Sequence, residues 1–130
     1  MTRQLVSSGV KWEKTVGYSR AVKVGPHVYV SGTVAVDERG EIVGRGDAYA
    51  QTVFILGKIG KALEEAGASL KQVTRTRMFV TDIELFDSIG RAHGEVFHEI
   101  RPAATMVEVS ALVDPELFVE IEADAYIDPS

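Results

Sequence analysis

The sequence predicts a mixed α/β (α+β) fold in which two amphipathic helices cover one face of a single β-sheet. Three observations lead to this prediction. Short segments with the period-two alternation of strands occur near both ends of the chain and in its middle. Two longer segments between them have apolar residues three or four apart, as helices do. The 130 residues suffice for one hydrophobic core, so we expect a single domain over residues 1–130.

The predicted strands lie where apolar and polar residues alternate, or where turn residues bound an apolar run. In one of them Val28, Val30 and Gly32 alternate with polar or aromatic residues, which places all three on the same face. A turn-forming stretch at 37–40 then leads to a short return strand. The strands are predicted at residues 3–6, 21–24, 27–34, 41–43, 73–80, 105–111 and 117–127.

The two helices are predicted from their end signals as well as from their periodicity. Asp47 is suited to cap a first helix that runs to about residue 66, and Gly67 is suited to end it. Thr81 and Glu84 have the spacing of a capping box for a second helix that reaches about residue 99, before Pro102. The predicted apolar stripes are Tyr49, Val53, Leu56, Gly60 and Leu63 in the first helix, and Phe86, Ile89, His93, Val96 or Phe97, and Ile100 in the second.

Two glycines, Gly57 and Gly60, lie inside the first predicted helix. Each costs about 1 kcal/mol relative to alanine in a helix interior, so each needs a reason. One reason is close approach of the helix to the sheet, and the other is a role toward a ligand. We expect close packing.

Composition and motifs exclude several classes of function. The net charge of −5 and the scattered Lys and Arg residues argue against nucleic-acid binding. No apolar run is long enough to span a membrane, and the N-terminus lacks the apolar core of a signal peptide. The absence of cysteine excludes disulfides and thiolate chemistry, so we expect a cytoplasmic protein. Glycine-rich phosphate-binding motifs are missing, and His93 and His98 lie on different helix faces, so we expect no cofactor and no metal.

The last predicted strand carries Glu120, Glu122 and Asp124 on one face, because side chains alternate along a strand. Three acids in a row repel one another unless they are paired. Arg75 and Arg77 in the middle strand are suited to form cross-strand ion pairs with them, each contributing about 0.2–1 kcal/mol.

This acidic face has two interpretations. One is a solvated sheet face with salt bridges, which antiparallel sheets often have. The other is an interface, because Phe79, Met106 and Phe118 are predicted to share or border the same surface. No third helix is predicted to cover these groups, so we expect copies of the same chain to do so.

Five segments of the chain resemble the RidA (YjgF) family, in the right order and at the right spacing. They are GYSRAV at 17–22, VSGT at 30–33, RMFVTD at 77–82, RPAATMVEV at 101–109 and VEIEA at 119–123. The resemblance implies a chorismate-mutase-like fold and a homotrimer whose three sheets form a central barrel. It also implies ligand clefts between the subunits.

Members of this family with deaminase activity hydrolyse small enamines and imines to 2-oxo acids and ammonia without a cofactor. The resemblance assigns the glutamate that positions the attacking water to Glu120, with Glu122 as the alternative. Tyr18 corresponds to the tyrosine of the cleft, and Gly32 with its neighbour Ser31 corresponds to the backbone that contacts the substrate.

The family's arginine for the substrate carboxylate falls on Ala104, so this chain departs from the pattern. Such an arginine grips a carboxylate with two parallel hydrogen bonds, and its loss removes affinity and orientation. Thr105 and Met106 are still expected to shape the pocket. A cation from elsewhere could replace the arginine; the candidates are Arg20, Arg91 and Arg101. Arg101 could equally bind the last carbonyls of the second helix.

The resemblance therefore leads to two functional hypotheses. The first is a deaminase-like hydrolase that acts on enamines or imines of small metabolites in intersubunit clefts. The second is a trimer that binds a small metabolite without turnover. A third activity attached to the family, that of a ribonuclease or translation inhibitor, is disfavoured by the acidic charge of the chain.

Overall fold

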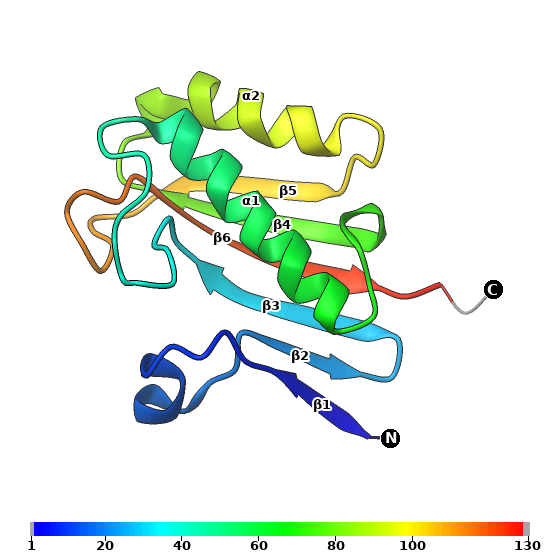
Figure 1. Cartoon of the computed structure of the whole chain (residues 1–130). Coiled ribbons are helices and arrows are strands. Elements are labelled where there is room, and N and C mark those ends of the chain that lie inside the picture. Colours follow the sequence, from blue (N-terminus) through cyan, green and yellow to red (C-terminus); the bar gives the residue numbers. More distant parts are fainter. Residues whose placement is uncertain (1, 129–130) are drawn as a thin grey trace.

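The computed structural model describes residues 2–128 and contains a six-stranded sheet with two α-helices on one side (Figure 1). The strand order is β1-β2-β3-β6-β4-β5. All neighbours are antiparallel except β4 and β5, which are parallel because α2 connects them as a crossover. The strands are β1 (Arg3–Val6), β2 (Ala21–Val24), β3 (His27–Thr33), β4 (Val73–Val80), β5 (Ala103–Glu108) and β6 (Val119–Tyr126).

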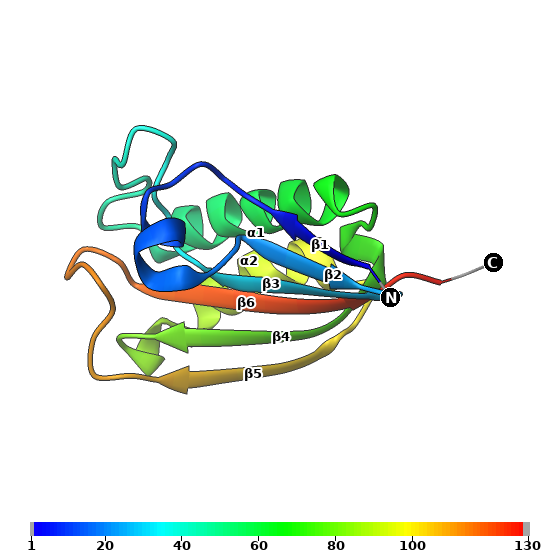
Figure 2. The ribbon, with the colours of Figure 1, turned by 90° about the horizontal axis from the view of Figure 1, so that it is seen from below.

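The helices are α1 (Ala48–Glu65) and α2 (Phe86–Phe97). Three short helical turns accompany them: η1 (Glu13–Gly17), η2 (Leu70–Gln72) and η3 (Ile83–Leu85). Figures 1 and 2 show both α-helices on the same side of the sheet, as the sequence predicts. No helix among the described residues combines the length and the apolar composition that crossing a membrane requires.

Helix α1 begins where the sequence predicts, because the Asp47 carboxylate accepts a hydrogen bond from the Ala50 N–H at 3.0 Å. Its buried face includes Ile55, Ile59 and Leu63, which pack into the core between the helix and the sheet. The predicted stripe is partly wrong. Val53 is 46% exposed, because the buried face of α1 is centred on Ile55 and Ile59, which the predicted stripe does not include.

Gln51 on α1 fixes the entry into β6. Its side-chain amide donates to the Glu116 carbonyl at 3.0 Å and accepts from the Phe118 N–H at 2.9 Å. The Gln51 side chain is fully buried, so these bonds replace the ones it would make to water. They hold the chain immediately before Glu120.

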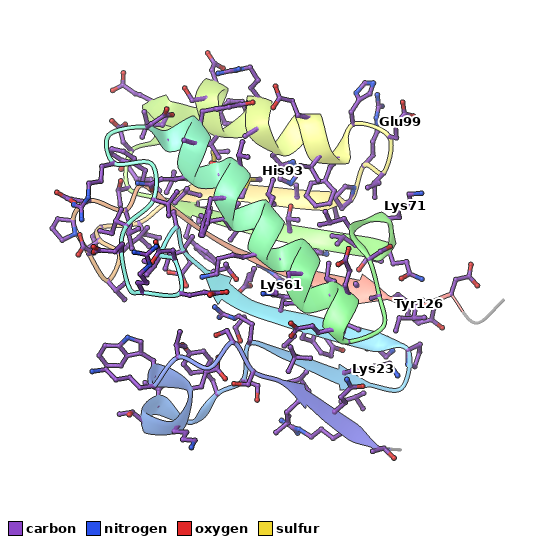
Figure 3. The ribbon with its side chains drawn as sticks, viewed as in Figure 1. Lys23, Lys61, Lys71, His93, Glu99 and Tyr126 are labelled. Carbon is purple, nitrogen blue, oxygen red and sulfur yellow. The ribbon has the colours of Figure 1, made fainter. Side chains whose placement is uncertain are left out.

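The start of α2 differs from the predicted capping box. Asp82, rather than Thr81, accepts the capping hydrogen bond, from the Glu84 N–H at 2.9 Å, and the turn η3 precedes the helix. Phe86 is 55% exposed and does not belong to the buried stripe. His93 does face the sheet (Figure 3), where its Nε2 is 2.8 Å from the Thr76 hydroxyl. Burial lowers the pKa of His93, as expected of a histidine held neutral in the core.

A β-bulge interrupts the pairing of β3 with β6. Val30 lies opposite Ala123 and Thr33 lies opposite Ile121, so β3 has one more residue than β6 between these pairs. The extra residue reverses the alternation, and Thr33 becomes fully buried on the helix side. The predicted placement of Gly32 on the face of Val28 and Val30 is therefore wrong: the bulge turns Gly32 toward the face without helices.

Strand β5 is shorter than predicted, and its faces are assigned differently. Met106 lies beside Met78, which is buried under the helices, and Met106 itself packs against the core. It therefore does not border the acidic face. Val107 lies there instead, beside Phe79, and is 41% exposed. The predicted return strand after β3 is reduced to a single bridge, between Val36 and Ile42.

Candidate functional site

Glu120 lies directly over Gly32 on the face of the sheet that the helices leave open. A Cβ at position 32 would overlap Glu120 Oε2 and stand 3.0 Å from its Cδ. Only glycine leaves room for the carboxylate in this position. The bulge in β3 and the neighbouring strand β6 thus bring together two residues that the resemblance assigns to one site.

Arg20 is the third member of this group. It is 8% exposed, and its Nη2 donates a 2.8 Å hydrogen bond to the Gly32 carbonyl. Its guanidinium also lies over the ring of Tyr18, 5.8 Å from the ring centre, and Tyr18 is 36% exposed. Tyr18, Arg20, Gly32 and Glu120 are called the Glu120 cluster below.

The local hydrogen bonds explain why the chain places Arg20 there. Arg20 immediately precedes β2, whose first residue Ala21 pairs with Val30 of β3. The Ser31 N–H donates to the Arg20 carbonyl at 3.0 Å, and the Ser31 hydroxyl donates to the Ser19 carbonyl at 2.6 Å. The Ser31 side chain therefore anchors the segment that carries Tyr18 and Arg20.

The Glu120 carboxyl is half-buried, and its pKa is raised above the ordinary value for a glutamate. Burial raises its pKa; the Arg20 charge opposes this shift and the Glu122 charge adds to it. No lysine or arginine within residues 2–128 forms an ion pair with it. A half-buried carboxyl group with a raised pKa and no ion-pair partner among the described residues is suited to accept and return a proton.

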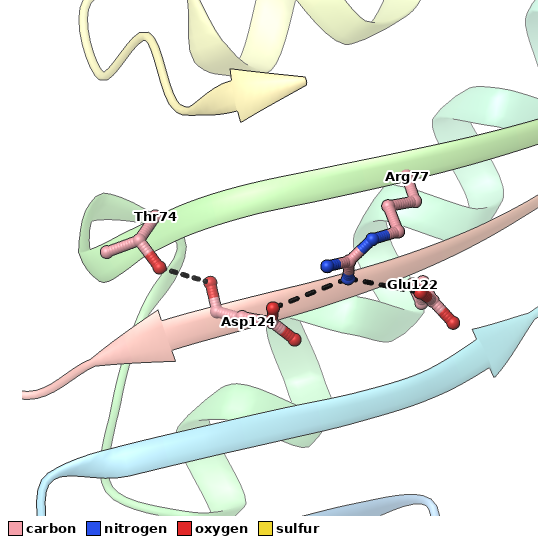
Figure 4. A network of polar contacts seen from close by, with 4 residues as sticks. All are labelled: Thr74, Arg77, Glu122 and Asp124. Atoms are coloured by element: carbon pink, nitrogen blue, oxygen red, sulfur yellow. Dashed lines mark hydrogen bonds and ion pairs between the residues drawn. The ribbon is translucent and has the colours of Figure 1, made fainter. Parts of the chain in front are cut away.

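The other two acids of β6 are paired. Arg77 Nη1 lies 3.2 Å from Glu122 Oε1 and 3.4 Å from Asp124 Oδ2 (Figure 4). The Thr74 hydroxyl donates to the Asp124 carbonyl at 3.2 Å. The predicted cross-strand pairing is confirmed for Arg77, and it distinguishes Glu122 and Asp124 from Glu120.

The remaining predicted site residues lie on another part of the sheet. Ala104, Thr105 and Met106 belong to β5, which β4 separates from β6. At about 4.8 Å per strand step, β5 lies about 10 Å from β6 and farther from β3. One chain therefore does not bring these residues together with the Glu120 cluster. Ala104 and Thr105 are exposed, at the free edge of the sheet.

Two of the three candidate replacement arginines also lie elsewhere. Arg91 on α2 stacks on the ring of Tyr49, 4.0 Å from its centre. Arg101 follows α2 with a positive φ of 55° and donates from Nε to the His98 carbonyl at 3.1 Å, so it binds the end of the helix. Arg20 alone of the three belongs to the Glu120 cluster.

Sequence reasoning missed the contribution of Glu13. This side chain is buried and accepts hydrogen bonds from the Ser8 N–H at 3.0 Å and the Ser8 hydroxyl at 2.7 Å. Burial opposes its ionisation, but these bonds and the charge of Arg20 together hold its pKa below the usual value. No sequence motif indicated that Glu13 is buried and bonded to Ser8. Across residues 2–128, no group of three acidic or histidine side chains is arranged to hold a metal ion.

Comparison with known proteins identifies the family of the chain. Residues 10–127 match the family model described as endoribonuclease L-PSP. Rv2704 of Mycobacterium tuberculosis, a member of the YjgF/YER057c/UK114 family, is 48% identical with a TM-score of 0.88, over 97% of this chain and 100% of its own. RidA from an Antarctic Psychrobacter is 33% identical with a TM-score of 0.81, over 98% and 99% of the two chains.

A curated relative adds the name of an activity. The 3-aminoacrylate deaminase RutC of Acinetobacter baylyi is 40% identical over 110 residues, which cover 85% of this chain and 86% of RutC. The chain therefore belongs to the YjgF/RidA family, whose sequence model carries the description endoribonuclease L-PSP. The resemblance noted in the sequence is confirmed.

Proposed function

We propose that this protein is a cofactor-independent hydrolase of small enamines or imines, in which Glu120 handles the attacking water. The observation that carries the proposal is the placement of the Glu120 carboxyl over Gly32, with a raised pKa and no ion-pair partner among the described residues. The RutC relative supports an enamine as the substrate class.

The proposed reaction balances without any other reactant. An imine, R₂C=NH, and water give R₂C=O and ammonia. Glu120 takes a proton from water as the water oxygen attacks the imine carbon, and it returns this proton to the nitrogen. In the resulting carbinolamine, Glu120 takes the hydroxyl proton and delivers it to nitrogen, so that the C–N bond breaks and ammonia leaves. An enamine enters the same path after tautomerising to the imine.

Other groups of the cluster orient the substrate in this proposal. The Tyr18 hydroxyl and the backbone near Gly32 bind its polar atoms. Arg20 supplies positive charge beside Glu120, which offsets part of the cost of forming the carboxylate. Because its Nη2 is already bonded to the Gly32 carbonyl, Arg20 has fewer free N–H donors for a substrate carboxylate than an unbonded guanidinium has.

The cleft is completed by a second copy of the chain. Thr105 and its neighbours lie at the free edge of β5, too far from Glu120 of the same chain to contact one substrate. We propose a homotrimer in which the β5 edge of one subunit faces the Glu120 cluster of the next. The open acidic face of the sheet then lies inside the assembly.

The experiment generates 2-aminoacrylate or another imine precursor in situ and measures the release of ammonia and of the oxo product. The wild-type protein should accelerate the release, Glu120→Gln should not, and Glu122→Gln should retain the activity. No acceleration by the wild type over a panel of such substrates would refute the proposal. Light scattering tests the assembly separately, and a monomeric mass at micromolar concentration would refute the trimer.

One observation favours the alternative, a trimer that binds a metabolite without turnover. Ala104 offers no polar group where the family resemblance places the carboxylate-binding arginine, and Arg91 and Arg101 are engaged elsewhere. In that case a ligand binds to the Glu120 cluster, and Glu120→Gln changes its affinity while no substrate is consumed.

A further inference from the structure

A cavity of about 720 Å³ lies against α1, and Arg20 of the Glu120 cluster is part of its lining. Its walls are the segment after β1, the loop after β3 and one side of α1. Val36 and Phe54 give it apolar surface, and Arg20 and Lys58 give it positive charge. It is called the α1 cavity below.

Four cations line the α1 cavity, namely Arg20, Arg39, Lys58 and Lys61, and Lys61 forms an ion pair with Glu38. Within residues 2–128 neither Arg20 nor Lys58 has a carboxylate within ion-pair distance. Lys58 Nζ donates one hydrogen bond, to the Val36 carbonyl at 2.9 Å, and lies 5.8 Å from the centre of the Phe54 ring. Arg20 Nε is buried without any hydrogen-bond partner. Burying a donor without a partner is unfavourable, so an acceptor group that reaches Arg20 Nε from the cavity would stabilise this arrangement.

The acids that also line the cavity are mostly engaged elsewhere. The Asp37 carboxylate accepts the Arg39 and Glu41 N–H groups at 2.9 and 3.0 Å. Glu38 pairs with Lys61 at 3.8 Å. Glu65 is the third acid and follows Lys58 by two helical turns on α1. Lys58 itself is half-buried, and burial followed by the Arg20 charge lowers its pKa while Asp37 opposes the shift.

Gly57 lies at the wall of the α1 cavity and keeps that part of the wall free of a side chain. Of the two glycines inside α1, Gly60 is explained by packing, because a Cβ there would stand 3.1 Å from Leu70 Cδ1. A Cβ on Gly57 would meet nothing within 4 Å. The close packing expected for Gly57 is therefore wrong, and this glycine weakens the helix at the wall of the α1 cavity without a packing reason.

We propose that the α1 cavity binds a small organic monocarboxylate. Its carboxylate lies between Arg20 and Lys58, and its apolar body lies against Phe54, Val36 and the bare backbone of Gly57. This site does not depend on the proposed hydrolysis, although Arg20 contributes to both places. A ligand here would act on the same arginine that touches Gly32.

The test is a titration of the full chain with isovalerate, followed through backbone amide resonances, with the neutral isostere isovaleramide beside it. Isovalerate should shift the amides of Val36, Gly57 and Lys58 in a saturable way, and isovaleramide should not. Lys58→Met should weaken isovalerate binding by at least about tenfold, the worth of one charge-assisted hydrogen bond. Lys71→Met is the matched control, because Lys71 is an exposed lysine of η2 outside the cavity (Figure 3), and it should bind as the wild type does.

Gly57→Ala gives a second variant that does not threaten folding. It should raise the melting temperature and weaken isovalerate binding, because the methyl group occupies the cavity wall. Equal binding of isovalerate and isovaleramide, unchanged affinity in Lys58→Met, or shifts confined to the Glu120 cluster would each overturn the proposal. Tighter binding of inorganic phosphate than of isovalerate would overturn the choice of an organic carboxylate. Glu120→Gln separates the two proposals, since it should abolish hydrolysis and leave isovalerate binding intact.

Discussion

Glu120 and Glu122 lie two residues apart on the same face of β6, yet their surroundings differ. The opposite strand β4 presents Arg77 to Glu122 and Phe79 to Glu120. Glu122 consequently shares the Arg77 guanidinium with Asp124, whereas Glu120 lies between an aromatic side chain and Gly32. The comparison teaches that the partner strand, more than the acidic strand itself, decides which carboxylate is held in a salt bridge and which stays available for chemistry.

The strongest way to break this comparison is to remove each carboxylate in turn. Glu120→Gln should lower the rate of imine hydrolysis by about 10²- to 10⁴-fold, the range for a general acid–base group. Glu122→Gln keeps the same strand and the same charge change, and it should leave the rate within a few-fold of the wild type. Ammonia release measures both, and equal losses in the two variants would show that the acids are not distinct.

Gly32→Ala tests the position of Glu120 without altering its chemistry. The added Cβ forces the carboxylate away from residue 32, and a displacement of about 1 Å can cost about a hundredfold in rate. The Glu120 side chain is flexible, so the variant should still fold. Gly90→Ala on α2 is the control, because a Cβ there meets nothing within 4 Å. A Gly32→Ala protein with full activity would contradict the assigned position.

Arg77→Met should remove the ion pairs that Glu122 and Asp124 of β6 form with Arg77. Loss of the partially exposed ion pairs should lower the free energy of unfolding by about 0.5–1 kcal/mol and leave hydrolysis nearly unchanged. Urea denaturation at low and high salt measures the effect, which should shrink as salt screens the charges. A large loss of activity with little loss of stability would mean that Arg77 serves the Glu120 cluster.

The smallest expected effect is a pH dependence of stability. The pKa of Glu120 is raised in the folded protein above 4.5, so ionisation of Glu120 disfavours the folded state. Glu120→Gln should therefore be slightly more stable than the wild type near pH 7. The difference should shrink as the pH falls through the folded-state pKa of Glu120, and it should vanish below 4.5, where both states are protonated. Thermal unfolding from pH 4 to 8 measures this, and a constant difference would point to another cause.

Much of the fold followed from local signals in the sequence. The Asp47 cap, the boundaries of the middle strand and the pairing of Arg77 with the acids depend on spacing and residue type, which the sequence displays directly. The orientation of Ser31 and Gly32 in the sheet did not follow from local signals. Strict alternation placed Gly32 on the core face, and only the register with β6 reveals the bulge that turns it outward.

The candidate site was predicted only in part, because some of its contacts depend on how strands meet and not on local sequence. The family resemblance named Tyr18, Gly32 and Glu120, and the fold brings these three together. It did not indicate that Arg20 holds the Gly32 carbonyl, because that contact depends on how two neighbouring strands meet. The β5 residues, Thr105 among them, remain a prediction, because their place in a site requires a second copy of the chain.

The most direct test of the central contrast is a pH titration of the Glu120 side-chain carboxyl by carbon-13 NMR, with Glu120→Gln used to assign the resonance. We predict that Glu120 titrates above 4.5, the ordinary value for a glutamate, because it is half-buried and without a paired cation. Titration at or below that value would contradict the account, since it would mean that Glu120 is as well stabilised in its charged form as an ion-paired acid.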